Sequence, residues 1–110
     1  MAIVHIVMFQ FKPDASEATI QDVVDRMLSL KDQCIHPTTN KPYIKSSAGG
    51  KQTSPEGKSG GFTHIFVEEF ETEEDRDYYT LKDPAHLAFA NSLGAVVEKV
   101  QVVDFTPGVF

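Results

Sequence analysis

The sequence has one cysteine, Cys34, so no disulfide can form within the 110-residue chain. A lone cysteine is typical of proteins kept in a reducing compartment, and we expect a cytoplasmic location. Long apolar runs are also absent, since no stretch approaches the roughly 20 apolar residues that a transmembrane helix needs. The N-terminus lacks the basic region and small-residue cleavage site of a secretory signal. The sequence therefore predicts no membrane association.

Positive charge is scarce as well. Ten lysine and arginine residues stand against 16 aspartate and glutamate residues, which gives a net charge of −6. Proteins that bind nucleic acid need a concentrated basic face, and here the basic residues are scattered. We expect no nucleic-acid partner. The length and the 41% hydrophobic content predict one globular domain over residues 1–110.

Glycine is concentrated in one stretch, GGKQTSPEGKSGG, which holds five of the seven glycines. This composition predicts a flexible Gly/Ser-rich loop, which we place at 46–61. The stretch leads into a predicted strand, so it lacks the helix N-terminus that phosphate-binding loops use. A simple flexible connection and a mobile lid over a site both remain open.

Apolar periodicity predicts the regular elements. Alternation with a period of two predicts strands over 2–12, 41–48, 62–70 and 100–106. Helical spacing predicts helices over 17–34, from 72 to about 81, and again from 83. Asp14 or Ser16 caps the first helix, Thr72 the second and Asp83 the third. The inward stripe of the third helix is expected to contain His86, Phe89, Ala90, Leu93 and Val97.

This element order is β-α-β-β-α-β, which predicts an α+β, ferredoxin-like split with a four-stranded antiparallel sheet. Helices in this arrangement cover one face of the sheet. The other face is apolar too, because it carries Val4, Ile6, Met8, Ile65 and Val67. We therefore expect a second copy of the chain to cover that face in a homodimer.

Four separated motifs carry a family resemblance: HIVMFQFK, GGFTHIFVEEFE, DPAHLAF and VVDFTP. In this order they resemble the stress-responsive A/B barrel (Dabb) family. The resemblance implies a dimeric α+β barrel. It implies function less narrowly, because members range from plant stress proteins to an enzyme that closes a linear polyketide by an intramolecular aldol condensation. That enzyme needs no metal or cofactor, so the resemblance implies none here.

The resemblance also implies roles for individual residues. His86 matches the catalytic histidine of the cyclising enzyme, and Tyr78 or Tyr79 its tyrosine, with Tyr78 favoured because it follows Asp77. His5 and His64 match two histidines of the enzyme's cavity. The chain departs from the enzyme at two positions, Met27 for a tyrosine and Glu68 for an apolar residue. The substrate-binding residues expected on this basis are His5, His64, Glu68, Met27, Phe66, Phe89 and Tyr79.

Each of these polar residues has a structural alternative. His86 is either a base, kept neutral by the helix N-terminus, or a core histidine bonded to a backbone carbonyl. His5 and His64 either line a cavity or satisfy internal hydrogen bonds, and their spacing lacks a zinc signature. Glu68 either points into the cavity with a raised pKa or a cationic partner, or reaches water at the strand end. Asp104 closes a structural hydrogen bond or meets the dimer partner.

The sequence leaves three functions open. The first is a homodimer that binds a small apolar or aromatic metabolite and performs cofactor-free, polyketide-cyclase-like acid–base chemistry, with His86 as base and Tyr78 as hydrogen-bond donor. The second is a non-catalytic stress-response or ligand-binding homodimer. The third is a haem-degrading or oxygenase relative, which would need an axial histidine in a roomier pocket.

Overall fold

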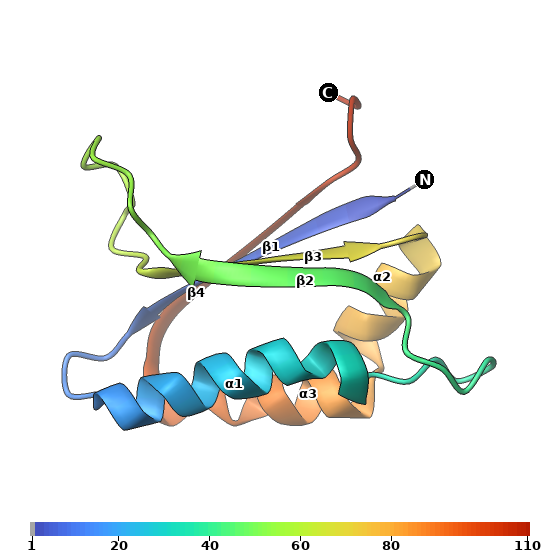
Figure 1. Cartoon of the computed structure of the whole chain (residues 1–110), viewed down its shortest axis with the longest axis horizontal. Coiled ribbons are helices and arrows are strands. Elements are labelled where there is room, and N and C mark those ends of the chain that lie inside the picture. The colour runs from blue at the N-terminus through green and yellow to red at the C-terminus, as the bar shows by residue number, and fades with distance from the viewer. Residues whose placement is uncertain (1) are drawn as a thin grey trace.

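The fold is a single sheet with helices on one face (Figure 1). A computed structural model describes residues 2–110. The elements are β1 (Ile3–Phe11), α1 (Glu17–Gln33), β2 (Ile44–Lys51), β3 (His64–Phe70), α2 (Glu73–Leu81), α3 (Pro84–Asn91), a 3-10 turn (Leu93–Ala95) and β4 (Val97–Phe105). The sheet is antiparallel with strand order β2-β3-β1-β4. This confirms the predicted ferredoxin-like arrangement, including the break between α2 and α3.

The helices begin at the predicted caps. Ser16, one of the two residues proposed for α1, and Thr72 before α2 each accept a backbone N–H through the side-chain oxygen. Asp83 does the same before α3, where its carboxylate accepts the N–H groups of Ala85 at 2.9 Å and His86 at 3.4 Å. These bonds fix where α3 starts and hence the place of His86 in its first turn.

α3 is shorter than the apolar stripe suggested. The Ser92 hydroxyl donates to the Phe89 carbonyl at 2.7 Å, and the helix ends at Asn91. Leu93 then lies in the 3-10 turn, and Val97 begins β4, where it pairs with Phe11. The prediction that Val97 continues the helical stripe is wrong, because pairing with β1 replaces the last turn of helix.

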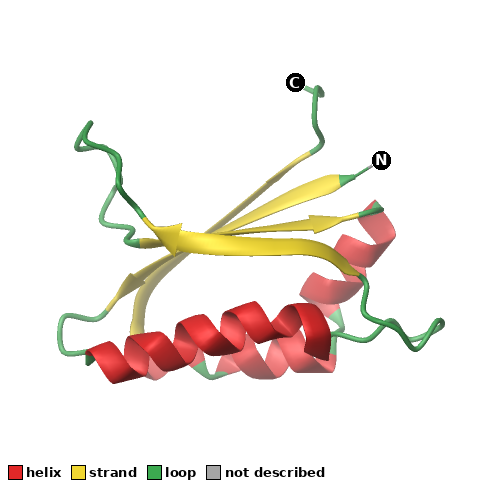
Figure 2. Ribbon diagram, in the orientation of Figure 1, coloured by secondary structure: helices red, strands yellow, loops and turns green. Residues whose placement is uncertain are grey.

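β2 also lies later in the sequence than predicted. It covers Ile44–Lys51, so residues 46–51 belong to a strand and the loop starts at Gln52. Gly49 is in this strand because the Phe66 ring packs against its backbone, and a Cβ there would lie 2.5 Å from the ring. The remaining loop projects from the end of the sheet on the side away from the helices (Figure 2).

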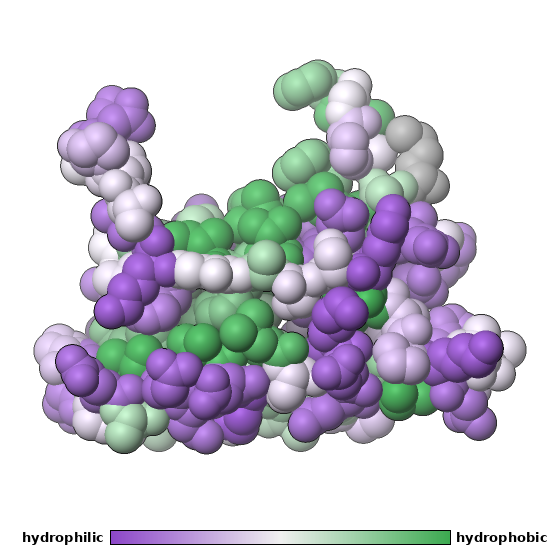
Figure 3. Space-filling view, viewed as in Figure 1, coloured by the Kyte–Doolittle hydropathy of each residue, from purple (hydrophilic) through white to green (hydrophobic). Residues whose placement is uncertain are grey.

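The two faces of the sheet differ in burial. On the helix-covered face, Val7, Phe9, Phe66 and Phe70 form the core with residues from α1, α2 and α3. On the open face, Val103 and Phe105 are 45% and 48% exposed, and apolar atoms gather there above the sheet (Figure 3). Among residues 2–110, no helix is long and apolar enough to cross a membrane.

Candidate active site

An apolar cavity of about 330 Å³ lies between the sheet and the helices, on the side of β1 and β4. Every layer of the fold contributes to its wall, because β1, α1, α2, α3 and β4 all supply side chains. The lining residues are His5, Val7, Phe9, Met27, Tyr79, Thr80, His86, Phe89, Ala90, Leu93, Val100 and Val102. The polar groups of this wall come mainly from two histidines and one tyrosine.

The cavity opens to solvent along β4. Val100 and Val102 pair with Phe9 and Val7, so they lie on the helix-covered face. They are nevertheless 47% and 49% exposed. The helices therefore leave this edge of the covered face free, and a small molecule has a route into the cavity.

His86 enters the cavity from the first turn of α3. Its ring packs against the Tyr79 ring, with 4.1 Å between centroids and 32° between planes. Its Nδ1 is buried without a hydrogen-bond partner, unlike that of a fully satisfied core histidine. Burial lowers the pKa of His86 and the nearby His5 lowers it further, while a contact with the Tyr79 backbone carbonyl and the charge of Asp83 act in the opposite direction. The ring is therefore neutral at pH 7, the state that a general base requires.

The two adjacent tyrosines of α2 lie in different surroundings. Tyr79 is 1% exposed and lines the cavity beside His86. Tyr78 is outside the cavity and packs against His36 and Tyr43, with ring centroids 6.4 and 5.8 Å away. Successive helical residues point about 100° apart, which accounts for this separation. The structure brings Tyr79 together with His86, and it does not bring Tyr78 there.

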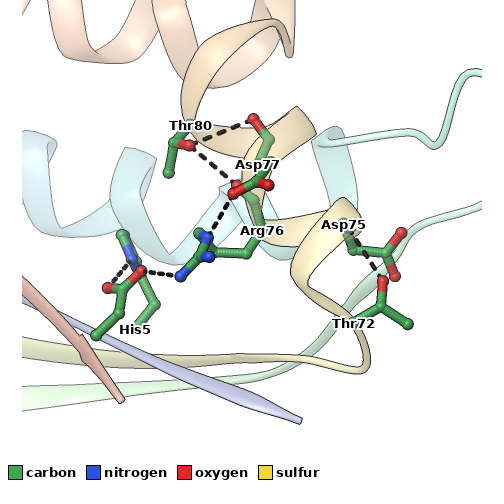
Figure 4. Close-up of polar contacts among 7 residues, drawn as sticks. His5, Thr72, Asp75, Arg76, Asp77 and Thr80 are labelled. Atoms are coloured by element: carbon green, nitrogen blue, oxygen red, sulfur yellow. Dashed lines mark hydrogen bonds and ion pairs between the residues drawn. The ribbon is translucent and has the colours of Figure 1, made fainter. Parts of the chain in front are cut away.

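His5 is held in place by a chain of charged groups. Its Nδ1 donates to the Asp104 carboxylate at 2.6 Å, and Arg76 donates to the other oxygen of that carboxylate at 2.9 Å. Figure 4 shows the Arg76 guanidinium between Asp77 and the carboxylate that bonds His5. Asp104 thus closes the structural hydrogen bond foreseen as one alternative. A carboxylate on one ring nitrogen fixes the orientation of the imidazole beside the cavity.

Glu68 is fully buried, at 0% exposure, so the alternative that it reaches water is wrong. Its carboxyl oxygens have no hydrogen bond of ordinary geometry. It is absent from the cavity wall and lies next to the Tyr79 hydroxyl, with His5 and Ser47 opposite it on the neighbouring strands. Burial raises the pKa of Glu68 to about 7, and the contact with Tyr79 acts in the opposite direction.

His64 lies away from this cavity. It pairs with Phe9, four residues along β1 from His5, and its ring contacts Thr63 Oγ1 at 2.8 Å and the edge of Phe11. Burial lowers the pKa of His64, and Lys51 adds to the effect. No three histidine, cysteine or carboxylate side chains converge into a metal-binding group anywhere in the described part of the chain.

The three apolar residues predicted for the site differ in placement. Met27 and Phe89 line the cavity, whereas Phe66 packs behind Phe9, with ring centroids 5.7 Å apart. Val100 and Val102 were not among the predicted site residues, although their alternation with Asp104 along β4 indicates the same face. Arg76 was not predicted either, and no local pattern points to it because its partner Asp104 is far away in the sequence.

Comparison with known proteins identifies the family of the chain. The family model of the Stress responsive A/B Barrel Domain matches residues 3–107. The chain is 31% identical to the stress-response A/B barrel domain-containing protein HS1 of Arabidopsis thaliana, over 94% of this chain and 87% of that protein. It is 28% identical to olivetolic acid cyclase of Cannabis sativa, over 97% of this chain and 98% of that protein.

Solved structures share the fold. A crystal structure of an Arabidopsis thaliana protein matches with a TM-score of 0.83 and 30% identity, covering 98% of this chain and 97% of the other. Hydroxynitrile lyase from Passiflora edulis matches with a TM-score of 0.83 at 23% identity, over 99% and 96%. A protein from Jannaschia sp., described as dimeric and ferredoxin-like, gives 0.76 at 19%, over 96% and 99%. Because the family model covers nearly the whole chain, this protein belongs to the stress-responsive A/B barrel domain family.

Proposed function

We propose that the protein binds a small apolar or aromatic metabolite bearing a carbonyl group and acts on it by cofactor-free acid–base chemistry, as a polyketide cyclase does. The observation that carries this proposal is the contact of His86 with Tyr79 in a cavity of about 330 Å³ whose other lining residues, apart from His5 and Thr80, are apolar. A cavity of this size is within the range that binds small molecules, and few polar groups in an apolar wall are typical of such sites.

The chemistry assigned to these residues is the carbon–carbon bond-forming addition of an intramolecular aldol reaction. His86, neutral at pH 7, takes a proton from a carbon next to a carbonyl group of the substrate. The Tyr79 hydroxyl donates a hydrogen bond to the enolate oxygen that forms. The enolate carbon then attacks a second carbonyl carbon of the same molecule, a carbon–carbon bond forms, and the new alkoxide takes a proton back from His86.

The remaining cavity residues bind and orient the substrate. Met27 and Phe89 provide apolar contact on the helix side of the cavity. His5, fixed by Asp104, offers its second ring nitrogen to a polar group of the ligand. His64 lies outside this set and contributes to packing of the fold.

The functional unit in this proposal is a cytoplasmic homodimer joined through the open sheet face. Val103 and Phe105 are exposed on that face, and the Jannaschia protein of the same fold is described as dimeric. Val103→Asp would place a charge there and convert the dimer to a monomer in size-exclusion chromatography with light scattering. Leu28→Asp, at an exposed apolar position on α1, is the matched control and leaves the dimer intact. A wild-type protein that is monomeric at micromolar concentration contradicts the dimer.

The catalytic proposal is tested with linear poly-β-keto thioesters as substrates. Mass spectrometry following chromatography detects ring-closed products formed by the wild-type protein and by His86→Ala. Loss of the base is expected to lower turnover by about 100-fold or more. Equal turnover by the two proteins overturns the assignment of His86.

A second candidate function is ligand binding without catalysis, which the 31% identity to a stress-response protein favours. In that case an aromatic ketone such as acetophenone binds in the cavity, while no thioester is cyclised by any variant. Isothermal titration with the ketone, run beside the turnover assay, distinguishes the two candidates.

A further inference from the structure

The unpaired polar atoms of the core gather around Tyr79. Among residues 2–110, four buried side-chain atoms lack a hydrogen-bond partner: Ser47 Oγ, both carboxyl oxygens of Glu68, and His86 Nδ1. Glu68 lies beside the Tyr79 hydroxyl, Ser47 faces Glu68 across the strands, and His86 packs on the Tyr79 ring. Unpaired buried groups are uncommon in proteins and costly, so their grouping behind a candidate site calls for a functional cause.

Within the described part of the chain, residues 2–110, no cation is paired with Glu68. The groups that face it are His5 from β1, Ser47 from β2, Tyr79 from α2 and Cys34 from the end of α1. His5 is already bonded to Asp104. Burial raises the pKa of the Cys34 thiol, which is therefore neutral. A buried carboxylate without a cationic partner is strongly disfavoured, whereas a neutral carboxylic acid needs only one acceptor for its proton.

A second acidic side chain, that of Asp83, lies beyond Cys34, and both of its carboxylate oxygens already accept hydrogen bonds. Asp83 is 1% exposed, accepts the Tyr43 hydroxyl at 2.6 Å and caps α3. Its negative charge reaches Cys34 and His86. Asp83 thus adds to the negative surroundings and gives Glu68 no proton donor.

Resting on the proposed function, we propose that Glu68 is a positioning residue that acts through Tyr79. In its neutral form, Glu68 donates its proton to the Tyr79 hydroxyl oxygen, and the Tyr79 O–H is then free to donate to a carbonyl oxygen in the cavity. In its ionised form, Glu68 accepts the Tyr79 O–H and withdraws it from the ligand. The ionisation state of the Glu68 carboxyl therefore decides whether the Tyr79 O–H is available to donate to a ligand.

The pH at which Glu68 changes between these two forms is set by its burial. Since burial raises the pKa of Glu68 to about 7, the neutral form dominates below neutral pH and the ionised form above it. Affinity for a carbonyl ligand therefore falls as pH rises through about 7. A glutamine at position 68 cannot ionise, so the affinity of Glu68→Gln for a carbonyl ligand does not depend on pH in this range.

The first test needs no ligand. Carbon-13 NMR follows the Glu68 side-chain carboxyl from pH 4 to 9, with Glu68→Gln used to assign its signal. A midpoint near 7 in the wild-type protein, and a higher midpoint in Tyr79→Phe, support the proposal, because the lost hydroxyl no longer stabilises the ionised form. A midpoint below 5, or one that Tyr79→Phe leaves unchanged, overturns it.

The second test measures acetophenone affinity between pH 6.5 and 8.5. The wild-type protein and Glu69→Gln, a matched control on the opposite face of β3, are expected to lose about 10-fold in affinity across this range. Glu68→Gln is expected to bind equally at all pH values. A pH dependence retained in Glu68→Gln overturns the proposal. Failure of the ketone to bind any variant counts against the proposed function instead, and the carboxyl titration then decides the pairing of Glu68 with Tyr79.

Discussion

Two histidines, His5 and His64, lie on the same helix-covered face of the sheet, and their surroundings differ. The His5 ring lines a cavity and is held from behind by Asp104. The His64 ring contacts the edge of Phe11, is bonded to its own neighbour Thr63, and lines a separate hollow with Gln10 and Lys51. Both rings therefore border space, but only the His5 ring is oriented by a carboxylate and shares its cavity with a second histidine and a tyrosine. A histidine on a buried face is a candidate for chemistry where other polar groups converge on the same space.

The two ends also differ in how their polar atoms are satisfied. Near His64, one ring nitrogen and the Thr63 hydroxyl are bonded to each other. Near His5, the carboxyl of Glu68 and one nitrogen of His86 are buried without partners. Buried polar groups that remain unpaired reduce stability, so the His5 end is expected to contribute less to stability than the His64 end.

The largest expected effect on stability comes from Glu68→Gln. The folded-state pKa of about 7 lies above the ordinary value of 4.5, so the folded protein binds the Glu68 proton more tightly than the unfolded chain does. The contribution of Glu68 to stability is therefore complete below about pH 4.5 and is lost as pH rises to about 7, by about 3 kcal/mol. Glu68→Gln lacks this loss.

Urea unfolding at several pH values measures this difference. The free energy of unfolding of the wild-type protein, minus that of Glu68→Gln, is expected to decrease between pH 4.5 and 7. Taking the difference cancels the contributions of His64 and His86, whose lowered pKa values act in the opposite direction. A constant difference across this range would contradict the burial of an unpaired carboxyl.

A smaller effect is expected from filling the cavity at the His5 end. Ala90 lines the cavity from α3, and Ala90→Trp would occupy space that a ligand needs. We expect at least about 10-fold weaker binding of acetophenone by isothermal titration, because a steric clash removes much of the ligand's buried surface. Ala88→Trp, on the same helix but outside the cavity, is the control and should bind normally.

The smallest effect is expected for His64, at the other end of the helix-covered face of the sheet. His64→Gln removes a packed ring and its bond with Thr63, and we expect a loss of about 1 kcal/mol in the free energy of unfolding. Ketone affinity should stay within about twofold of the wild-type value. A large loss of affinity with unchanged stability would place His64 in the site and remove the contrast between the two ends.

Much of the fold follows from local patterns in the sequence. Strand alternation, the three caps and the break before Pro84 are short-range features, and each predicted its element. The errors occurred where a distant partner decides the structure. Gly49 suggested a loop, but it belongs to a strand because the Phe66 ring packs on it. Val97 fitted a helical stripe, but it pairs with Phe11 in the sheet.

For the site, too, features set by local sequence patterns could be predicted, and features set by contacts with distant residues could not. The place of His86 could be predicted because Asp83 and Pro84 fix the start of α3 a few residues away. The choice between Tyr78 and Tyr79 depends on how α2 is rotated against the sheet, which no local pattern determines. The complete burial of Glu68 likewise depends on α2 and the end of α1 covering the strand.

The proposed chemistry requires Tyr79, rather than its neighbour Tyr78, to act with His86. The most direct test compares Tyr79→Phe with Tyr78→Phe, two variants that each lose one hydroxyl from adjacent positions of the same helix. Turnover of a linear poly-β-keto thioester is expected to fall by about 100-fold in Tyr79→Phe, the size of effect seen when one donor to a developing oxyanion is removed. Tyr78→Phe should keep wild-type turnover. Equal losses in the two variants, or a loss in Tyr78→Phe alone, would contradict the account.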